Sequence, residues 1–289
     1  MKRNVLQSIL QTLAFVIALT PITLLNGCGR SDAAPESNVL TVVSKAIGLA
    51  EEPMLAAEMI DLVIDASEGS SASLATVEAT LNRVLPYAAA RPGSSVRLWA
   101  LGMELSDTRM VASVASAAPK RRGERARKTE ALRFVDTAKQ VLMQAAMPVF
   151  ERAAKKQSPI AEGVSRVAYS RAPAGMRRHI IVITDARQVG GTLKFDFECD
   201  SVPDPATFVE RLQSNAILAP ETLTDTTIHF SYVALEAVPK RPGCIVTLAR
   251  AQQIEAAWRA ALSAAGARNV SFTTDAPQLD THRTVGGAS

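Results

Sequence analysis

The sequence predicts an α/β domain with a doubly wound, mostly parallel sheet. Two apolar runs, 62–64 and 180–183, are each followed closely by an aspartate, as buried strands of a parallel sheet often are. Stretches with apolar residues at helical spacing separate the strand-like stretches. This alternation indicates helices on both faces of one sheet. With 47% hydrophobic and 21% charged residues, the chain can form a substantial core.

The elements of this domain are expected between residues 58 and 275. Only about five residues separate its second and third strands, too few for a crossover helix, so we expect an antiparallel pair at the sheet edge. Pro148 should kink or split the longest helix, and Ser158 should be an N-cap with Pro159 at the first helical position. Strands are expected at 59–64, 95–102, 108–114, 178–185, 227–235 and 270–273, and helices at 72–89, 129–154, from 158 onward, at 206–217 and at 248–265.

Residues 1–27 are interpreted as an export signal. Lys2 and Arg3 precede an apolar stretch that Thr20, Pro21 and Thr23 interrupt, which makes it too short for a membrane span. The segment ends in Leu-Asn-Gly-Cys, which resembles a bacterial lipoprotein box. The alternative is an uncleaved anchor with an incidental cysteine.

The lipoprotein resemblance implies a location in the cell envelope. Cys28 would carry the acyl chains that hold the protein in a membrane, and residues 28–57 would be the tether and the lead-in to the domain. Gly29 stands where an aspartate often retains lipoproteins at the inner membrane, which favours the outer membrane, with the domain facing the periplasm.

The charge of the chain does not indicate a nucleic-acid binder. Removal of residues 1–27 lowers the formal net charge from +4 to +2. The basic stretch 119–128 is either a solvated loop before the long helix or a contact for anionic lipid headgroups. It has no interleaved aromatic residues that could stack on bases.

Oxygen-bearing side chains follow the first strand. Asp65, Ser67, Ser70 and Ser71 stand just beyond its carboxyl end, where open α/β sheets bind their ligands. Such oxygen ligands suit a hard cation such as Mg²⁺. The alternative is that Asp65 and Ser67 only cap the helix that begins near residue 72.

Over residues 58–275 the chain resembles the von Willebrand factor A domain family. Members carry D-x-S-x-S on the first loop, a threonine on a later loop and an aspartate after the fourth strand. Gly69 occupies the second serine position here, so Ser70 or Ser71 would replace that serine, and Ala186 stands where the family commonly has glycine. The resemblance implies these metal ligands: Asp65, Ser67, Ser70, Ser158 and Asp185.

The resemblance also implies a function. The domain would bind an envelope protein whose acidic side chain completes the coordination of Mg²⁺, with Mn²⁺ or Ca²⁺ as alternatives, and it would not be an enzyme. A second interpretation is a metal-free scaffold in an envelope assembly. A hydrolase with Asp65 or Asp185 as base is the third, and it lacks a recognisable nucleophile–histidine pair.

The two other cysteines are predicted to form a disulfide. Export would place them in an oxidising compartment. Cys199 and Cys244 follow two strands that are neighbours in the family's sheet, so the resemblance implies that they lie side by side; two unpaired thiols are the alternative. His179 and His229 lie within predicted strands and are interpreted as core or edge residues and not as metal ligands. Residues 276–289 have no pattern and are predicted to be a disordered tail.

Overall fold

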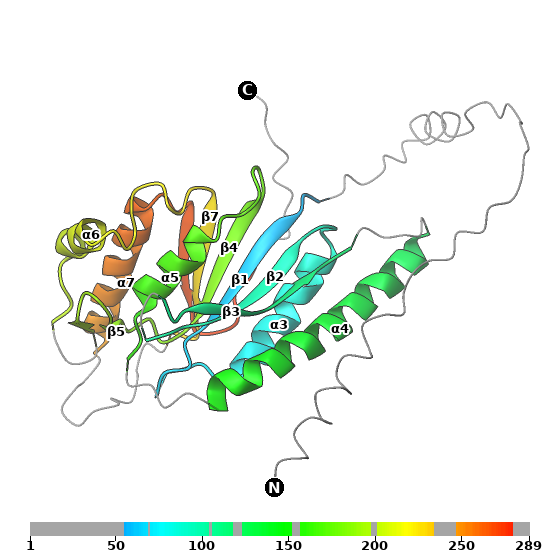
Figure 1. Ribbon diagram of the computed structural model, residues 1–289, viewed down its shortest axis with the longest axis horizontal. Helices are drawn as coiled ribbons and strands as arrows, with labels where there is room; N and C mark the ends of the chain where they lie inside the picture. Colours follow the sequence, from blue (N-terminus) through cyan, green and yellow to red (C-terminus); the bar gives the residue numbers. More distant parts are fainter. Residues whose placement is uncertain are drawn as a thin grey trace, which may run out of the picture. The chain divides into compact units, whose positions relative to one another are not determined.

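Six strands form one sheet in the order β3-β2-β1-β4-β7-β8 (Figure 1). The computed structural model describes residues 55–68, 70–103, 106–117, 123–151, 157–197, 201–233 and 247–279. The strands are β1 (Glu58–Ile64), β2 (Ser95–Ala100), β3 (Arg109–Ala115), β4 (Arg177–Ile183), β5 (Val189–Gly190), β6 (Phe195–Asp196), β7 (Thr226–Ser231) and β8 (Asn269–Thr273). The helices are α3 (Leu74–Ala89), α4 (Glu124–Glu151), α5 (Ile160–Tyr169), α6 (Pro205–Ser214) and α7 (Leu248–Ala264).

The sheet is parallel except at one edge. β1 pairs in parallel with β2 and β4, β4 pairs with β7, and β7 pairs with β8. β3 runs antiparallel to β2, as the short connection predicts. The predicted α/β class with an antiparallel edge strand is confirmed. All seven residues of β1 are buried, because the strand lies inside the sheet with both faces covered.

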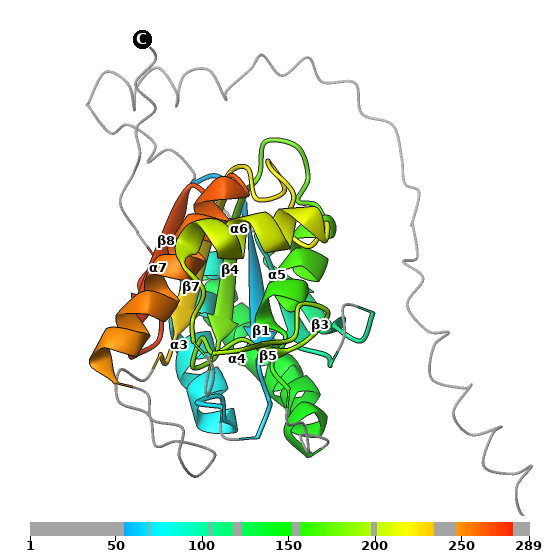
Figure 2. The same cartoon turned by 90° about the vertical axis from the view of Figure 1, so that its left-hand side faces the viewer.

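Helices cover both faces of the sheet (Figure 2). Ile60, Leu62 and Ile64 of β1 pack with apolar residues of α3 and α4. Val63 points to the opposite face and joins a cluster with residues of α5, α6 and α7. This alternation follows from the two-residue period of a strand.

Helix α3 has its own cap, which excludes one alternative for the first loop. The Ser73 hydroxyl accepts a hydrogen bond from the Thr76 amide at 3.1 Å, and the Thr76 hydroxyl accepts one from the Ser73 amide at 2.8 Å. This is a capping box. The interpretation of Asp65 and Ser67 as the caps of this helix is therefore wrong.

The predicted N-cap of helix α5 is also wrong. Helix α5 begins at Ile160 with Pro159 at its N-cap position and no side-chain cap, so Ser158 does not cap it. Of the kink or split predicted at Pro148, the split does not occur, because α4 continues to Glu151, and the kink stays a prediction. The proline stands in the last turn, where it removes one backbone hydrogen bond near an end that frays in any case.

The chain between β4 and α6 contains a short hairpin that was not predicted. β5 and β6 have two residues each and pair antiparallel. Phe195 of β6 and Phe197 just after it pack with Phe208 of α6, with ring centroids 5.3 Å from that ring. β7 ends at Ser231, earlier than predicted.

Several predictions concern residues outside the described ranges. The signal and tether, Cys28, Cys199 and Cys244 all lie there, so the lipid anchor and the disulfide stay predictions. Among the described helices, none combines the length and the apolar character needed to cross a bilayer.

Candidate functional site

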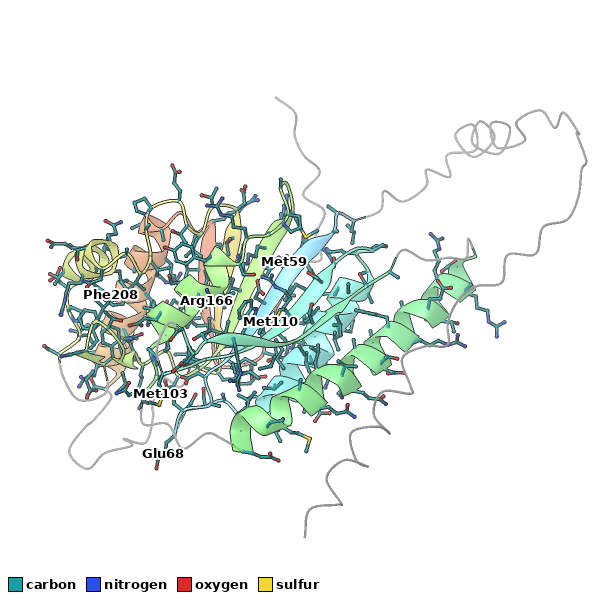
Figure 3. All side chains as sticks on the ribbon, in the orientation of Figure 1. Met59, Glu68, Met103, Met110, Arg166 and Phe208 are labelled. Carbon is teal, nitrogen blue, oxygen red and sulfur yellow. The ribbon has the colours of Figure 1, made fainter. Side chains whose placement is uncertain are left out.

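The candidate site lies at the carboxyl edge of the sheet. Glu68, after β1, and Met103, after β2, both lie at this end, whereas Met59 lies near the opposite end of β1 (Figure 3). Asp65 directly follows β1, and its residue is 1% exposed. Its amide donates to the Ile183 carbonyl at 3.1 Å, so it is held against the end of β4.

Asp65 collects hydrogen bonds from three segments of the chain. Its Oδ2 accepts from the Ser158 hydroxyl at 2.6 Å and from the Thr184 hydroxyl at 2.7 Å. Its Oδ1 accepts from the Ser67 amide at 3.3 Å. Ser158 is 93 residues from Asp65 in sequence, and Thr184 is 119 residues away. The fold therefore brings the loops after β1 and β4 and the segment before α5 to one carboxylate.

Asp185 is the second buried carboxylate at this edge. Its residue is 5% exposed, its Oδ1 accepts from the Arg187 amide at 3.1 Å, and its Oδ2 lies 3.8 Å from Arg187 Nε. The next residue, Ala186, is fully buried with a φ of +63°, a left-handed conformation. This conformation favours glycine, so the Cβ of Ala186 is strained there.

The two carboxylates interact unfavourably. Burial raises the pKa of Asp65, and the negative charge of Asp185 raises it further, whereas the hydroxyls of Ser158 and Thr184 act in the opposite direction. A cation between or beside the two carboxylates would remove this repulsion. The guanidinium of Arg187, whose Nε lies 3.8 Å from Asp185 Oδ2, already supplies one positive charge beside them.

Two serine hydroxyls of the first loop are buried beside the candidate site. Ser67 Oγ and Ser71 Oγ have no hydrogen bond of normal geometry among the described residues, although the Ser67 side chain lies close enough to Asp65 to lower the pKa of its carboxyl. Ser70 differs, because its hydroxyl accepts from the Ala72 amide at 3.3 Å. A buried polar atom without a partner costs about 1–3 kcal/mol, so a group that binds these hydroxyls would gain stability. Gly69 lies outside the described residues.

The loop after β4 is held rigidly against α5. Glu162 accepts hydrogen bonds from the Thr192 amide at 2.8 Å and from the Gln188 side chain at 3.2 Å. Gln188 Oε1 accepts from the Ala161 amide at 2.9 Å. A Cβ at Gly191, whose φ is +74°, would lie 2.2 Å from Glu162 Oε1. These contacts fix the backbone that carries Asp185.

A buried ion-pair cluster in the middle of the sheet is structural. Asp61 Oδ1 lies 2.6 Å from Arg97 Nε and accepts from the Trp99 indole at 2.7 Å, and Asp61 Oδ2 lies 2.7 Å from Arg178 Nε. Arg178 also donates to the carbonyls of Val167 and Ala168 at the end of α5. Every partner is a protein group, and the cluster joins β1, β2, β4 and α5.

A row of polar side chains crosses the other face of the sheet. Ser271 Oγ lies 2.8 Å from His229 Nδ1, His229 Nε2 lies 3.2 Å from His179 Nδ1, and His179 Nε2 lies 3.0 Å from Glu58 Oε2. The serine–histidine pair has the spacing of an activated nucleophile. However, burial and then the charge of His179 lower the pKa of His229 to about 3, which makes it a weak base near neutral pH. The row does not favour the hydrolase interpretation.

The structure brings four of the five predicted metal ligands to one edge, and it adds a residue that sequence reasoning missed. Asp65, Ser67, Ser158 and Asp185 belong to the network above, and Ser70 is hydrogen bonded within its own loop. Thr184 was missed, although its place directly before Asp185 was a usable signal. Among the described residues, no group of three or more His, Cys, Asp or Glu side chains could hold a metal. A cation here would need hydroxyl oxygens beside the two carboxylates.

Models of known protein families do not match this sequence, and neither do curated proteins.

Proposed function

We infer that this chain is a membrane-anchored binding protein of the cell envelope, with a von Willebrand factor A-like domain that holds a divalent cation and binds an acidic side chain of a protein partner. The observation that carries the proposal is the hydrogen bond of 2.6 Å between Ser158 and Asp65. It joins the segment before α5 to the first loop, next to the second carboxylate. The family's motif requires such a meeting of three chain segments.

The residues fit a hard cation. Asp65 and Asp185 supply two carboxylates, and the hydroxyls of Ser67, Ser71 and Ser158 supply neutral oxygens, which is the ligand chemistry of Mg²⁺ and Mn²⁺. Ca²⁺ prefers six to eight oxygens, more than this set offers, so we favour the smaller ions. The buried hydroxyls of Ser67 and Ser71 would gain the partner that they lack among the described residues.

The cation would supply the attraction for the partner. Mg²⁺ binds six oxygens and keeps positions that its protein ligands do not fill. An acidic side chain of another protein can take such a position. The protein's own residues would hold the cation and orient the partner's carboxylate, and they would break no bond. The proposal includes a lipid on Cys28. This anchor would keep the candidate site, at the carboxyl edge of the sheet, near other envelope proteins.

The metal-free scaffold is the second candidate function, and Arg187 is the observation that favours it. Its guanidinium is buried, and its Nε lies 3.8 Å from Asp185. An internal positive charge of this kind offsets part of the repulsion at the edge without an added ion. In that case the protein would bind other envelope proteins through its outer surface and not through the carboxyl edge of the sheet.

Capture of partners from an envelope extract separates the two functions. The immobilised full chain should retain partner proteins with 5 mM MgCl₂ and release them with excess EDTA. Asp185→Ala should lose this capture, and Asp136→Ala, at an exposed position of α4, should not. Capture of the same proteins in EDTA would leave the scaffold as the function.

A further inference from the structure

A small cavity opens beside the candidate site, between the first turns of α7 and the ends of β4, β7 and β8. Its volume is about 90 Å³. Asp185 and Ala186 belong both to its wall and to the candidate site, so the two are continuous. Its apolar lining consists of Ala186, Val233, Ala251, Ile254 and Phe272.

The walls of this cavity are held in place by packing. Phe272 stacks on Phe230, with ring centroids 4.8 Å apart and planes 4° from parallel. Ile254 is 4% exposed and belongs to the core cluster under α7. Trp258, one turn further along α7, donates to the Ala186 carbonyl at 2.9 Å. The cavity is therefore preformed, and a ligand would not have to create it.

Each charged residue in the lining has an oppositely charged partner. Glu255 Oε1 lies 2.6 Å from Arg259 Nη2 on the same helix. Arg187 Nε lies 3.8 Å from Asp185 Oδ2. Apart from Thr273 and Thr274, the rest of the lining is apolar, so the cavity favours an uncharged occupant. An engineered cavity of about 150 Å³ holds a benzene ring, so 90 Å³ fits one branched aliphatic side chain better than an aromatic one.

We propose that this cavity receives a Val, Ile or Leu side chain of the same partner segment whose carboxylate completes the coordination of the cation. The proposal rests on the proposed function and adds a recognition rule to it. Because Asp185 belongs both to the cavity wall and to the candidate site, and consecutive residues of an extended chain advance by about 3.3–3.6 Å, the proposal places the aliphatic residue one or two positions from the acidic residue. The partner is thus recognised by an acidic residue next to a branched aliphatic residue.

Selection from a peptide library tests the rule without knowledge of the natural partner. The immobilised full chain is incubated in 5 mM MgCl₂ with phage that display random linear peptides of twelve residues, and bound phage are eluted with EDTA. The eluted peptides should share an aspartate or glutamate with Val, Ile or Leu one or two positions away. A synthetic consensus peptide should bind at least about tenfold more tightly than the same peptide with the aliphatic residue replaced by serine.

A matched pair of variants locates the contact. Ala251→Leu adds three carbons inside the cavity and should weaken binding of the consensus peptide at least about tenfold, without changing the shift of the melting temperature by Mg²⁺. Gln252→Leu introduces the same side chain at an exposed position of the same helix and should bind the peptide as the wild type does. The δ1 methyl resonance of Ile254 should shift with the consensus peptide and not with its serine version.

The outcomes separate this inference from the proposed function. EDTA-eluted peptides that share an acidic residue but no aliphatic neighbour would overturn the inference and leave the cation-dependent binding intact. Equal binding of the peptide by Ala251→Leu and by the wild type would also overturn it. A library that yields no EDTA-eluted peptide would overturn the proposed function and, with it, this inference.

Discussion

Replacement of Asp65 by asparagine should stabilise the protein when no divalent cation is present. The change removes a fully buried negative charge next to Asp185 and keeps the size of the side chain. The hydroxyls of Ser158 and Thr184, which donate to Oδ2, can rotate and accept from the new amide instead. Each unit by which the charge of Asp185 raises the pKa of Asp65 corresponds to about 1.4 kcal/mol, so loss of this repulsion should stabilise the domain by on the order of 1–2 kcal/mol. For a domain of this size each kcal/mol corresponds to about 2–4 °C in melting temperature.

The order of stabilities should reverse when the cation is saturating. A ligand at 100 times its dissociation constant stabilises the native state by about 2.7 kcal/mol. The wild type should gain this amount, about 5–11 °C, in saturating MgCl₂. The Asp65→Asn variant should gain little, because the amide is a poorer ligand and carries no charge.

Thermal unfolding of both proteins in EDTA and along a MgCl₂ titration measures these effects. Asp136→Asn, at an exposed position of α4, should behave as the wild type within about 0.5 kcal/mol in both conditions. If Asp65→Asn melts below the wild type in EDTA, the carboxylate of Asp65 is a structural acceptor for Ser158 and Thr184. Charge repulsion between Asp65 and Asp185 would then not limit the stability of the metal-free protein.

Three further predictions concern other parts of the chain. The pKa of His229 is lowered by burial from 6.5 to about 3; between these values the unfolded chain binds a proton that the folded chain does not. Stability should therefore fall by about 1.4 kcal/mol per unit as the pH drops below 6.5, and urea unfolding of His229→Gln at pH 7, 6 and 5 should lack this slope. Cys28→Ser should give unprocessed or soluble protein; a processed, acylated membrane form would contradict the lipoprotein box. Thiol titration of unreduced mature protein should find Cys199 and Cys244 oxidised, in a bridge that closes about 45 residues and contributes about 3–4 kcal/mol; two reactive thiols would contradict it.

The fold class was predictable because the strongest strand signals coincide with the central strands. The apolar runs at 62–64 and 180–183 belong to β1 and β4, which are neighbours and are buried on both faces. A strand in this position has to be apolar nearly throughout, which makes it visible in a single sequence. The antiparallel edge was predictable for another reason, since a short connection excludes a crossover.

The buried polar residues were not predictable, because their partners depend on register. Asp61 interrupts the apolar pattern of β1, and a lone aspartate in a strand gives no sign of burial. In the sheet Asp61 lies beside Arg97 of β2, while Arg178 reaches it from β4. This satisfies the charge that an isolated strand would expose. The partners are 36 and 117 residues away in sequence, so neither spacing nor composition identifies them.

In the candidate site, too, the sequence pattern indicated which residues are involved, whereas only the contacts in the fold show what each residue does. The order of Asp65, Ser158 and Asp185 along the chain suggested one site, but Asp65 and Ser158 each also had a local interpretation as a helix cap. Two local facts decide between these roles: Ser73 caps α3 itself, and α5 begins one residue too late for Ser158 to cap it in the predicted way. Because Asp65, Ser67 and Ser158 do not cap α3 or α5, their oxygens can form other contacts at the carboxyl edge of the sheet. The Ser158–Asp65 hydrogen bond joins two residues that are 93 positions apart in sequence, and this contact, which the sequence alone does not show, is what makes the proposed cation site testable as one unit.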